Sequence, residues 1–278
     1  MKVINYGSLN IDLVYRVHEF VRPGETISAM DFSRFVGGKG LNQSIALARA
    51  GAPVMHAGAV GEDGDFLLDT LKQSNVDCMY VEKLAGVASG HAVIQVNDHG
   101  ENCIVLFGGA NHAIDEAHAE AVLSHAEPGD ILLLQNEISC IPHIMRTANR
   151  LGMRIFFNPA PMTSQVLAYP LDLVDTLIVN ETEMESLGNH VPEKANILKT
   201  LGANGAEYNG MKVPAEKVAN VVDTTAAGDT FIGYFIAELV AGLDVRTAME
   251  TATRASAWCI QRMGASPSIP SRKDIQKN

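Results

Sequence analysis

The sequence predicts an α/β fold with a central, mostly parallel sheet, and three observations support this prediction. Short apolar runs recur at Val3–Tyr6, Val54–Val60, Ile131–Leu134, Ile155–Phe157 and Leu177–Val179. They are continuous rather than alternating, as is typical of strands buried on both faces of a parallel sheet. The segments between them are long enough for helices, and 47% of the 278 residues are hydrophobic. We therefore expect residues 1–278 to form a single domain around one large core.

A small second sheet is predicted from residues of about 13–36 and 90–108. The moderately apolar segments Ala92–Val96 and Cys103–Phe107 flank residues 97–100, Asn-Asp-His-Gly, which suit a hairpin turn. A sheet standing off the main domain could act as a lid that excludes water from chemistry. An ordinary edge hairpin explains the same pattern equally well.

A glycine-rich cluster at Gly37–Gly40 introduces the first predicted helix. Leu41, Ile45 and Ala48 fall on one face of that helix, and Gly51 is its predicted C-cap. The cluster is not a Walker A loop, which requires G-x-x-x-x-G-K-[ST]. By itself it is weak support for a ligand site, because such glycines commonly form only a tight turn.

Polar residues end three of the predicted strands, at Gln135–Glu137, Asn158–Pro159 and Asn180–Glu183. In open α/β sheets, ligands bind outside the carboxyl ends of the strands. We therefore expect these three clusters to share one crevice.

The most specific motif is Asp-Thr-Thr-Ala-Ala-Gly-Asp-Thr-Phe at Asp223–Phe231. The apolar rows that follow predict a well-buried helix beginning near Ala227; these rows are Phe231, Phe235 and Leu239, and Ile232, Ile236 and Val240. Ala226, Ala227 and Gly228 let backbone N–H groups approach a ligand, and a helix N-terminus binds phosphate well. The motif therefore predicts an anion hole.

Asp229 is unusual in the first turn of such a helix, because its carboxylate would repel a phosphate. Its charge has a use if it acts as general base on an incoming hydroxyl group. The alternative is a helix-capping acid, the common role of an isolated Asp at a helix start.

Composition excludes several classes of function. The formal net charge is −11 and the chain has no Lys/Arg cluster, so we expect no nucleic-acid or anionic-membrane partner. The four cysteines form no C-x-x-C pair, and no apolar run reaches about 18 residues, so we expect a cytoplasmic protein. The histidines lack zinc-ligand spacing, and there is no G-x-S-x-G hydrolase motif.

Two of these motifs also resemble those of a known family. Residues Gly37–Gly61, with Asn42, Gly51 and Gly61 in place, and Asp223–Phe231 resemble the signatures of the ribokinase family of carbohydrate kinases, also called the phosphofructokinase-B family. The resemblance extends nearly end to end. It implies a ribokinase-like three-layer sandwich with a small β lid, and ATP-dependent phosphorylation of a sugar with Mg²⁺ and a monovalent cation, K⁺.

Within that family, Asn10-Ile11-Asp12, Gly38-Lys39-Gly40 and Asn136-Glu137 are most similar to the ribokinase branch. This implies conversion of ribose to ribose 5-phosphate, and a possible homodimer formed through the lid. The alternatives are a kinase of fructose, a sugar acid or a nucleoside, since one fold supports many substrates. A non-catalytic sugar-binding regulator on the same fold is the alternative from another class.

The resemblance also implies roles for individual residues. The sugar-contacting residues correspond to Asn10, Asp12, Gly38, Lys39, Gly40, Asn42 and Glu137. The catalytic set corresponds to Asp229 and the anion hole of Ala226, Ala227 and Gly228. Asn180 and Glu183 match an N-x-x-E motif implicated in organising Mg²⁺ and phosphate.

The nucleotide and cation sites are implied in the same way. The nucleotide loop corresponds to Thr200, Gly202, Asn204 and Gly205, with Gly228 at the phosphates and Thr253 at the adenine position. The monovalent cation would be enclosed by Asp223, Thr225, Cys259, Arg262, Gly264 and Ser268, mainly through backbone carbonyls.

The chain departs from the family pattern between Met184 and Lys199. The family normally fits a full helix and a strand there, whereas residues 189–199 are too few for both. We expect a reduced sheet edge on the nucleotide side, which puts ATP affinity and specificity in question.

Overall fold

The computed structural model describes residues 1–276, and its main body is a nine-stranded sheet in the order β13-β12-β11-β10-β9-β8-β1-β4-β5. The strands are β1 (Val3–Tyr6), β4 (Val54–Gly61), β5 (Asp77–Leu84), β8 (Ile131–Gln135), β9 (Arg154–Asn158), β10 (Thr176–Asn180), β11 (Asn196–Thr200), β12 (Ala206–Tyr208) and β13 (Met211–Val213). All neighbours from β11 to β5 are parallel, and only β12 and β13 are antiparallel. The predicted mostly parallel sheet is confirmed, and each of the apolar runs forms one of its strands.

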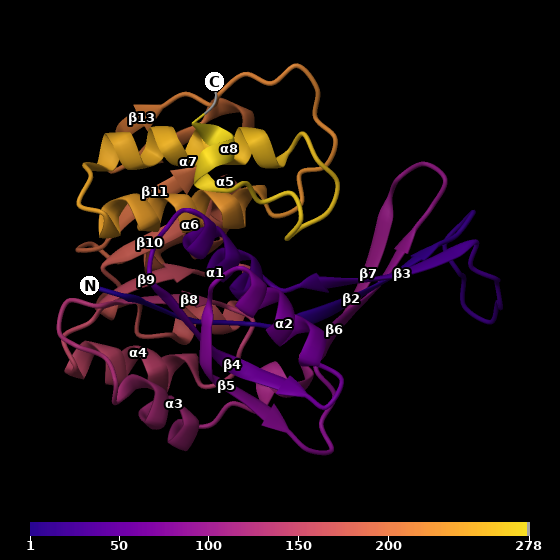
Figure 1. Cartoon of the computed structure of the whole chain (residues 1–278), viewed down its shortest axis with the longest axis horizontal. Coiled ribbons are helices and arrows are strands. Elements are labelled where there is room, and N and C mark those ends of the chain that lie inside the picture. Colours follow the sequence, from indigo (N-terminus) through magenta and orange to yellow (C-terminus); the bar gives the residue numbers. More distant parts are fainter. Residues whose placement is uncertain (277–278) are drawn as a thin grey trace.

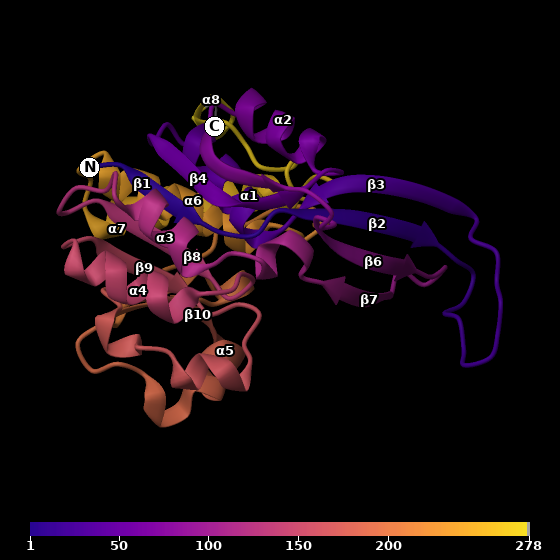
Figure 2. The same cartoon turned by 90° about the horizontal axis from the view of Figure 1, so that it is seen from below.

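Helices cover both faces of this sheet, which gives three layers (Figures 1 and 2). On one face lie α1 (Lys39–Arg49), α2 (Asp65–Gln73), α6 (Ala227–Val240), α7 (Val245–Cys259) and α8 (Arg272–Ile275). On the other lie α3 (Glu116–Leu123), α4 (Ile141–Arg150) and α5 (Glu181–Leu187). No helix within residues 1–276 is long and apolar enough to cross a membrane.

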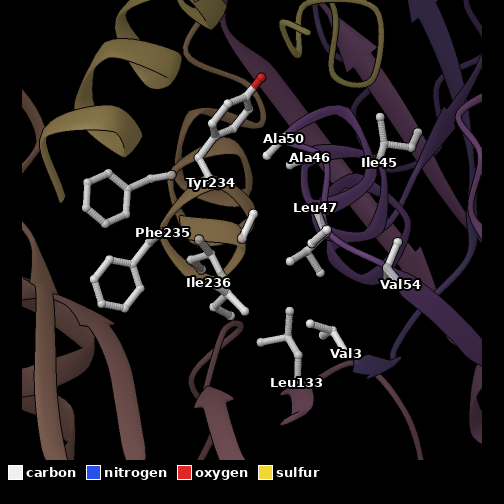
Figure 3. Packing of buried hydrophobic residues seen from close by; sticks show 14 of the residues in the cluster. Val3, Ile45, Ala46, Leu47, Ala50, Val54, Leu133, Tyr234, Phe235 and Ile236 are labelled. Carbon is white, nitrogen blue, oxygen red and sulfur yellow. The ribbon is translucent and has the colours of Figure 1, made fainter. Parts of the chain in front are cut away.

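Helices α1 and α6 pack closely against each other above the middle of the sheet. Figure 3 shows Ala46 and Leu47 of α1 facing Tyr234 and Ile236 of α6. At their contact, a Cβ atom on Gly233 would collide with the Cβ of Ala46 and lie 2.8 Å from the nitrogen of Leu47. The missing side chain lets the two helices approach, and this brings their N-terminal ends together.

A separate four-stranded sheet projects from the main body (Figure 1). Its order is β3 (Asp31–Gly37), β2 (Asn10–Arg16), β6 (Gly90–Val96) and β7 (Asn102–Phe107). The predicted hairpin is present as β6 and β7. Asn97 stabilises its turn, because Oδ1 accepts hydrogen bonds from the N–H groups of His99 and Glu101 at 3.0 and 2.9 Å.

Two local predictions can be compared with the structure. Residues 189–199 contain the start of one strand, β11, and no α-helix, as their number predicts; α5 instead begins directly after Asn180. The prediction that Gly51 is the C-cap of α1 was wrong by one residue. Ala50 is the C-cap, and Gly51 follows it in the left-handed conformation at φ 94°.

Candidate active site

A cavity opens where the carboxyl ends of β9, β10 and β11 meet the N-terminal ends of α1 and α6. It is lined by Lys39, Asn158, Ala160, Ile178, Val179, Asn180, Glu183, Thr200, Thr224, Ala226, Gly228, Asp229 and Ile232. Two of the predicted polar clusters, at the ends of β9 and β10, therefore face one crevice. The third lies beside it: the backbone N–H of Lys39 donates to Glu137 Oε2 at 3.0 Å.

The start of α6 has the features of an anion site. Ala226 precedes the helix in the left-handed conformation at φ 60°. The N–H of Ala227 donates to the Thr224 carbonyl at 3.2 Å, and that of Thr230 to the Ala226 carbonyl at 2.8 Å. Gly228 and Asp229 follow Ala227 in the first turn of α6. The first N–H groups of a helix have no carbonyl acceptor within the helix, so these two N–H groups are open to a ligand. A Cβ on Gly228 would meet nothing within 4 Å, so an anion has room there.

This arrangement limits the role predicted for Ala227. Its N–H already has an acceptor within the turn, so the amides left for a phosphate are those of Gly228 and Asp229. Ala226 and Ala227 shape the turn that presents them.

The carboxylate of Asp229 is held by α1. Oδ2 accepts a hydrogen bond from Asn42 Nδ2 at 3.1 Å, and Oδ1 accepts one from Gln43 Nε2 at 2.9 Å. These partners lie on a different helix, so the carboxylate does more than cap α6. Gln43 is fully buried and was missed from the sequence. The signal was the run Asn42-Gln43-Ser44, three polar residues in the first turns of an otherwise apolar helix.

The glycine cluster brings α1 onto the loop after β1. A Cβ on Gly40 would collide with Gly7 and Ser8, and one on Gly38 would lie 2.9 Å from the Ser8 carbonyl. The N–H of Leu41 donates to that carbonyl at 2.9 Å. These close contacts explain why the predicted helix start needs glycines, and they place the start of α1 against the loop between β1 and β2.

Asn10 and Asp12 project from β2 next to this cluster. Asp12 lies against Gly37, where an added Cβ would collide with its carboxylate. Burial, with a smaller effect of Glu137, raises the pKa of Asp12 to about 6. Asn10 Oδ1 accepts a hydrogen bond from the buried Asn111 Nδ2 at 2.7 Å, and Asn111 was also missed from the sequence.

Lys39 connects the two ends of the cavity electrostatically. Burial lowers its pKa, but the carboxylates of Asp229, Glu137 and Glu183 outweigh this effect and hold the pKa above its ordinary value. The ammonium group therefore stays charged and can attract an anionic ligand.

Asn180 and Glu183 form a capping box at the start of α5. Asn180 Oδ1 accepts from the N–H of Glu183 at 2.8 Å, and Glu183 Oε2 accepts from the N–H of Asn180 at 2.9 Å. Burial raises the pKa of Glu183, although the Asn180 N–H and Lys39 act in the opposite direction. A carboxylate facing a polar cavity suits Mg²⁺, which keeps much of its water and takes further oxygens from a phosphate ligand.

The predicted nucleotide residues are only partly brought together. Thr200 lines the cavity, whereas Gly202, Asn204 and Gly205 form the turn after β11, in which the N–H of Leu201 donates to the Gly205 carbonyl at 2.8 Å. Thr253 lies on α7 outside the cavity lining, and its hydroxyl donates to the Glu250 carbonyl at 2.9 Å.

The two loops of the predicted cation site are hydrogen-bonded to each other. Asp223 Oδ1 accepts from the N–H and the hydroxyl of Thr225 at 2.9 and 2.6 Å, and Oδ2 accepts from the N–H of Gly264 at 2.9 Å. The Cys259 thiol lies 3.6 Å from the Thr225 carbonyl and 3.0 Å from Ser268 Oγ. The N–H of Arg262 donates to the Cys259 carbonyl at 3.1 Å, so all six predicted residues are neighbours.

The side chain of Arg262 contacts a residue outside this set. Its guanidinium stacks 3.7 Å from the ring centre of Trp258 and donates to the Trp258 carbonyl. Within residues 1–276, no group of three or more His, Cys, Asp or Glu side chains could hold a metal ion. A site made of backbone carbonyls needs no such group. Burial raises the pKa of Asp223, but hydrogen bonds from Thr225 and Gly264 hold it below its ordinary value, so a negative charge is available beside the loops.

Comparison with known proteins identifies the family. The model of the pfkB family carbohydrate kinases matches residues 1–272. The chain belongs to this family. The kinase is 34% identical over 309 residues to the ribokinase of Staphylococcus aureus strain COL, with 99% of each chain covered. The predicted resemblance is therefore confirmed, and the chain is a carbohydrate kinase.

Solved structures agree with this assignment. The kinase matches the ribokinase of Cryptococcus neoformans var. grubii serotype A in complex with ADP, with a TM-score of 0.90, 31% identity and 99% of each chain covered. It also matches the Arabidopsis thaliana ribokinase complexed with ribose and ATP, with a TM-score of 0.86, 29% identity and coverage of 99% and 97%. The predicted ribokinase-like fold is confirmed.

Proposed function

We propose that this carbohydrate kinase transfers the γ-phosphate of ATP to the primary hydroxyl group of ribose, yielding ribose 5-phosphate and ADP. One observation carries the proposal: the Asp229 carboxylate and the open amides of Gly228 and Asp229 occupy the same helix turn. A base for a hydroxyl group and a site for a phosphate are then within one residue of each other. The ribokinases of S. aureus and A. thaliana, the second complexed with ribose and ATP, support ribose as the acceptor.

The proposed chemistry follows from the charges around this turn. The γ-phosphate lies against the amides of Gly228 and Asp229, and the hydroxyl oxygen of the sugar attacks it in line while Asp229 accepts the proton. The charged Lys39 and the α6 dipole stabilise the charge that spreads over the transferred oxygens. Mg²⁺ brought with ATP would neutralise phosphate charge near Glu183 and Asn180.

Sugar recognition is proposed for the polar groups on the lid side of Asp229. Asn10, Asp12, Glu137 and Asn42 come from separate elements, and Gly38, Lys39 and Gly40 offer a closely approaching backbone. Convergent polar groups of this kind suit a ligand that carries several hydroxyl groups.

The four-stranded sheet is proposed to be the lid, from residues of about 13–36 and 90–108 in a single kinase domain spanning residues 1–278. Closing it would exclude water, which competes with the sugar for the phosphate. Its exposed apolar residues include Phe32, Phe35 and Ile104–Phe107, which alternate between the two faces of the sheet, and they support a homodimer formed through the lid. A cytoplasmic location, where ATP is available and thiols stay reduced, suits the four free cysteines.

Nucleotide and cation binding complete the proposal. ATP extends from Gly228 past Thr200 toward the turn of Gly202, Asn204 and Gly205, with Thr253 near the adenine. K⁺ is proposed between the loops joined by Asp223 and Gly264, with Thr225, Cys259 and Ser268; Arg262 contributes at most its carbonyl group.

The test is ADP release from Mg·ATP with potassium present, measured across ribose, 2-deoxyribose, other pentoses, fructose, sugar acids and nucleosides. We expect ribose to give the highest kcat/KM. A higher value with another acceptor would replace ribose in the proposal. If no acceptor gave ADP release but a sugar still raised the melting temperature, the protein would be a sugar-binding regulator.

A further inference from the structure

A chain of buried side-chain amides runs beneath Asp229, from β1 through β8 to α1. It consists of Asn5, Gln135 and Gln43, whose exposed fractions are 0%, 1% and 0%. Buried amides are unfavourable unless their hydrogen bonds are satisfied, and apolar side chains of similar size would fill this space without that requirement. The chain therefore calls for an explanation other than packing.

The hydrogen bonds of this chain run outward from the NH₂ group of Gln135, toward Asn5 and toward Gln43. Gln135 Nε2 donates to Asn5 Oδ1 at 2.9 Å and to Gln43 Oε1 at 2.7 Å. Asn5 Nδ2 in turn donates to the Gly40 carbonyl and to Ser44 Oγ, both at 2.8 Å. Because the oxygen of Gln43 accepts from Gln135, its NH₂ group faces Asp229 and donates to Oδ1 at 2.9 Å.

Gln43 and Asn42 hold the same carboxylate in different ways. Asn42 is one of the residues expected to contact the sugar, so its bond to Asp229 can be exchanged when a sugar enters. Gln43 is fully buried beneath the carboxylate and cannot be reached by a ligand. A sugar therefore does not compete for its bond to Oδ1, whereas Oδ2 is bonded to Asn42, one of the residues expected to contact the sugar.

We propose that Gln43 is the positioning residue of the proposed general base: it fixes Oδ1 of Asp229, and Gln135 and Asn5 fix the orientation of Gln43. This inference rests on the proposed role of Asp229. It gives Gln43 a function in the rate of phosphoryl transfer rather than in the affinity for the sugar.

The test compares Gln43→Met, Gln135→Met and a matched control, Gln73→Met at the exposed end of α2. Ribose and ATP kinetics, ribose binding by calorimetry and melting temperature are measured for each. Because a small misplacement of a reacting group costs up to about 100-fold in rate, we expect kcat of Gln43→Met to fall by about 10- to 100-fold. The ribose Kd should stay within about twofold of wild type, since a transition-state interaction is lost. Gln135→Met should give a smaller loss in kcat, and Gln73→Met none.

A double variant separates positioning from a general packing defect. If Gln43 acts through Asp229, adding Gln43→Met to Asp229→Asn leaves the residual rate unchanged; a packing defect would lower it further. An unchanged kcat of Gln43→Met, or a change confined to ribose Kd, would overturn the inference. If Gln43→Met does not fold, Gln135→Met serves as the test, because Gln135 is hydrogen-bonded to Gln43. An unchanged kcat of Gln135→Met would then overturn the inference. Absence of turnover by the wild-type kinase would instead overturn the proposed function, and this inference with it.

Discussion

Asn42 donates a hydrogen bond from Nδ2 to Oδ2 of Asp229 at 3.1 Å, and this bond joins the start of α1 to the start of α6 across 187 positions of the chain. One residue carries the proposed base and the other is expected to contact the sugar. Their contact depends on the close packing of the two helices at Gly233. Through this pair of side chains the fold connects the proposed acceptor side of the cavity to the proposed phosphate side.

Replacing Asp229 with Asn tests the base directly. The amide has the same shape but cannot accept the proton, so we expect kcat to fall by about 100- to 10,000-fold. Ribose binding, measured by calorimetry, should persist because the other polar groups remain. Turnover near the wild-type value would show that the base has been assigned wrongly.

Gly233→Ala tests the packing that brings the two helix starts together. The added methyl group would collide with Ala46 and approach the backbone of Leu47. Overpacking of this kind destabilises a protein by about 1–3 kcal/mol, which thermal or urea unfolding would detect. We also expect a lower kcat, because separating α1 from α6 moves Asn42 away from Asp229. A variant as stable and as active as wild type would contradict this account of the site.

The strands could be predicted because their signals are local. Val3–Tyr6 is apolar except at Asn5 and Ile131–Leu134 is apolar throughout, and each forms a strand with almost the predicted bounds. The C-cap at Gly51 was displaced by one residue because a left-handed glycine commonly follows the cap residue itself. The antiparallel edge of β12 and β13 left no such signal, since each strand has only three residues.

The site was predicted where its residues belong to motifs and missed where they act through distant partners. Asp229 stands out because a carboxylate is unexpected beside an anion hole. Gln43 and Asn111 depend on contacts with residues 186 and 101 positions away, and their burial cannot be read from neighbouring residues. Ala227 belongs to the motif, but the motif does not reveal that its N–H donates to the Thr224 carbonyl and is therefore not open to a phosphate.

We expect Asp12 to make sugar binding dependent on pH. Burial raises its pKa to about 6, so the carboxylate becomes protonated as the pH falls through that value. An ionised carboxylate is the better acceptor for sugar hydroxyl groups, and we expect the KM for ribose to rise below about pH 6. Asp12→Asn should remove this pH dependence and raise KM at neutral pH. If KM rose equally at low pH in Asp12→Asn, the pH dependence would belong to another group.

The same shift has a consequence for stability. The unfolded chain holds Asp12 near its ordinary pKa of 3.8, so between about 4 and 6 the folded state binds more protons than the unfolded state. The contribution of Asp12 to the free energy of unfolding therefore increases as the pH falls from 7 toward 4. Comparing wild type with Asp12→Asn across this range isolates that contribution.

The exposed apolar residues of the proposed lid lead to a prediction about the oligomeric state. Val105 on β7 is 67% exposed on the four-stranded sheet, whereas Met79 on β5 is 73% exposed on the main body. If dimers form through the lid, Val105→Lys should convert them to monomers, because a charge would be buried without a partner. Met79→Lys is the control and should leave the dimer intact. Sedimentation equilibrium measures both, and a dimer insensitive to Val105→Lys would place the interface elsewhere.

Glu183 has a structural role in the capping box and a proposed role in Mg²⁺ binding, and two substitutions can separate them. Gln is accepted at the third helical position of a capping box, so Glu183→Gln should retain the bond to the Asn180 N–H and the melting temperature. It removes the charge that faces the cavity, and we expect a higher Mg²⁺ concentration for half-maximal rate. Glu183→Ala removes both functions and should also destabilise the protein by about 1 kcal/mol. If Glu183→Gln showed the wild-type Mg²⁺ dependence while Glu183→Ala lowered only the melting temperature, the residue would serve the helix alone.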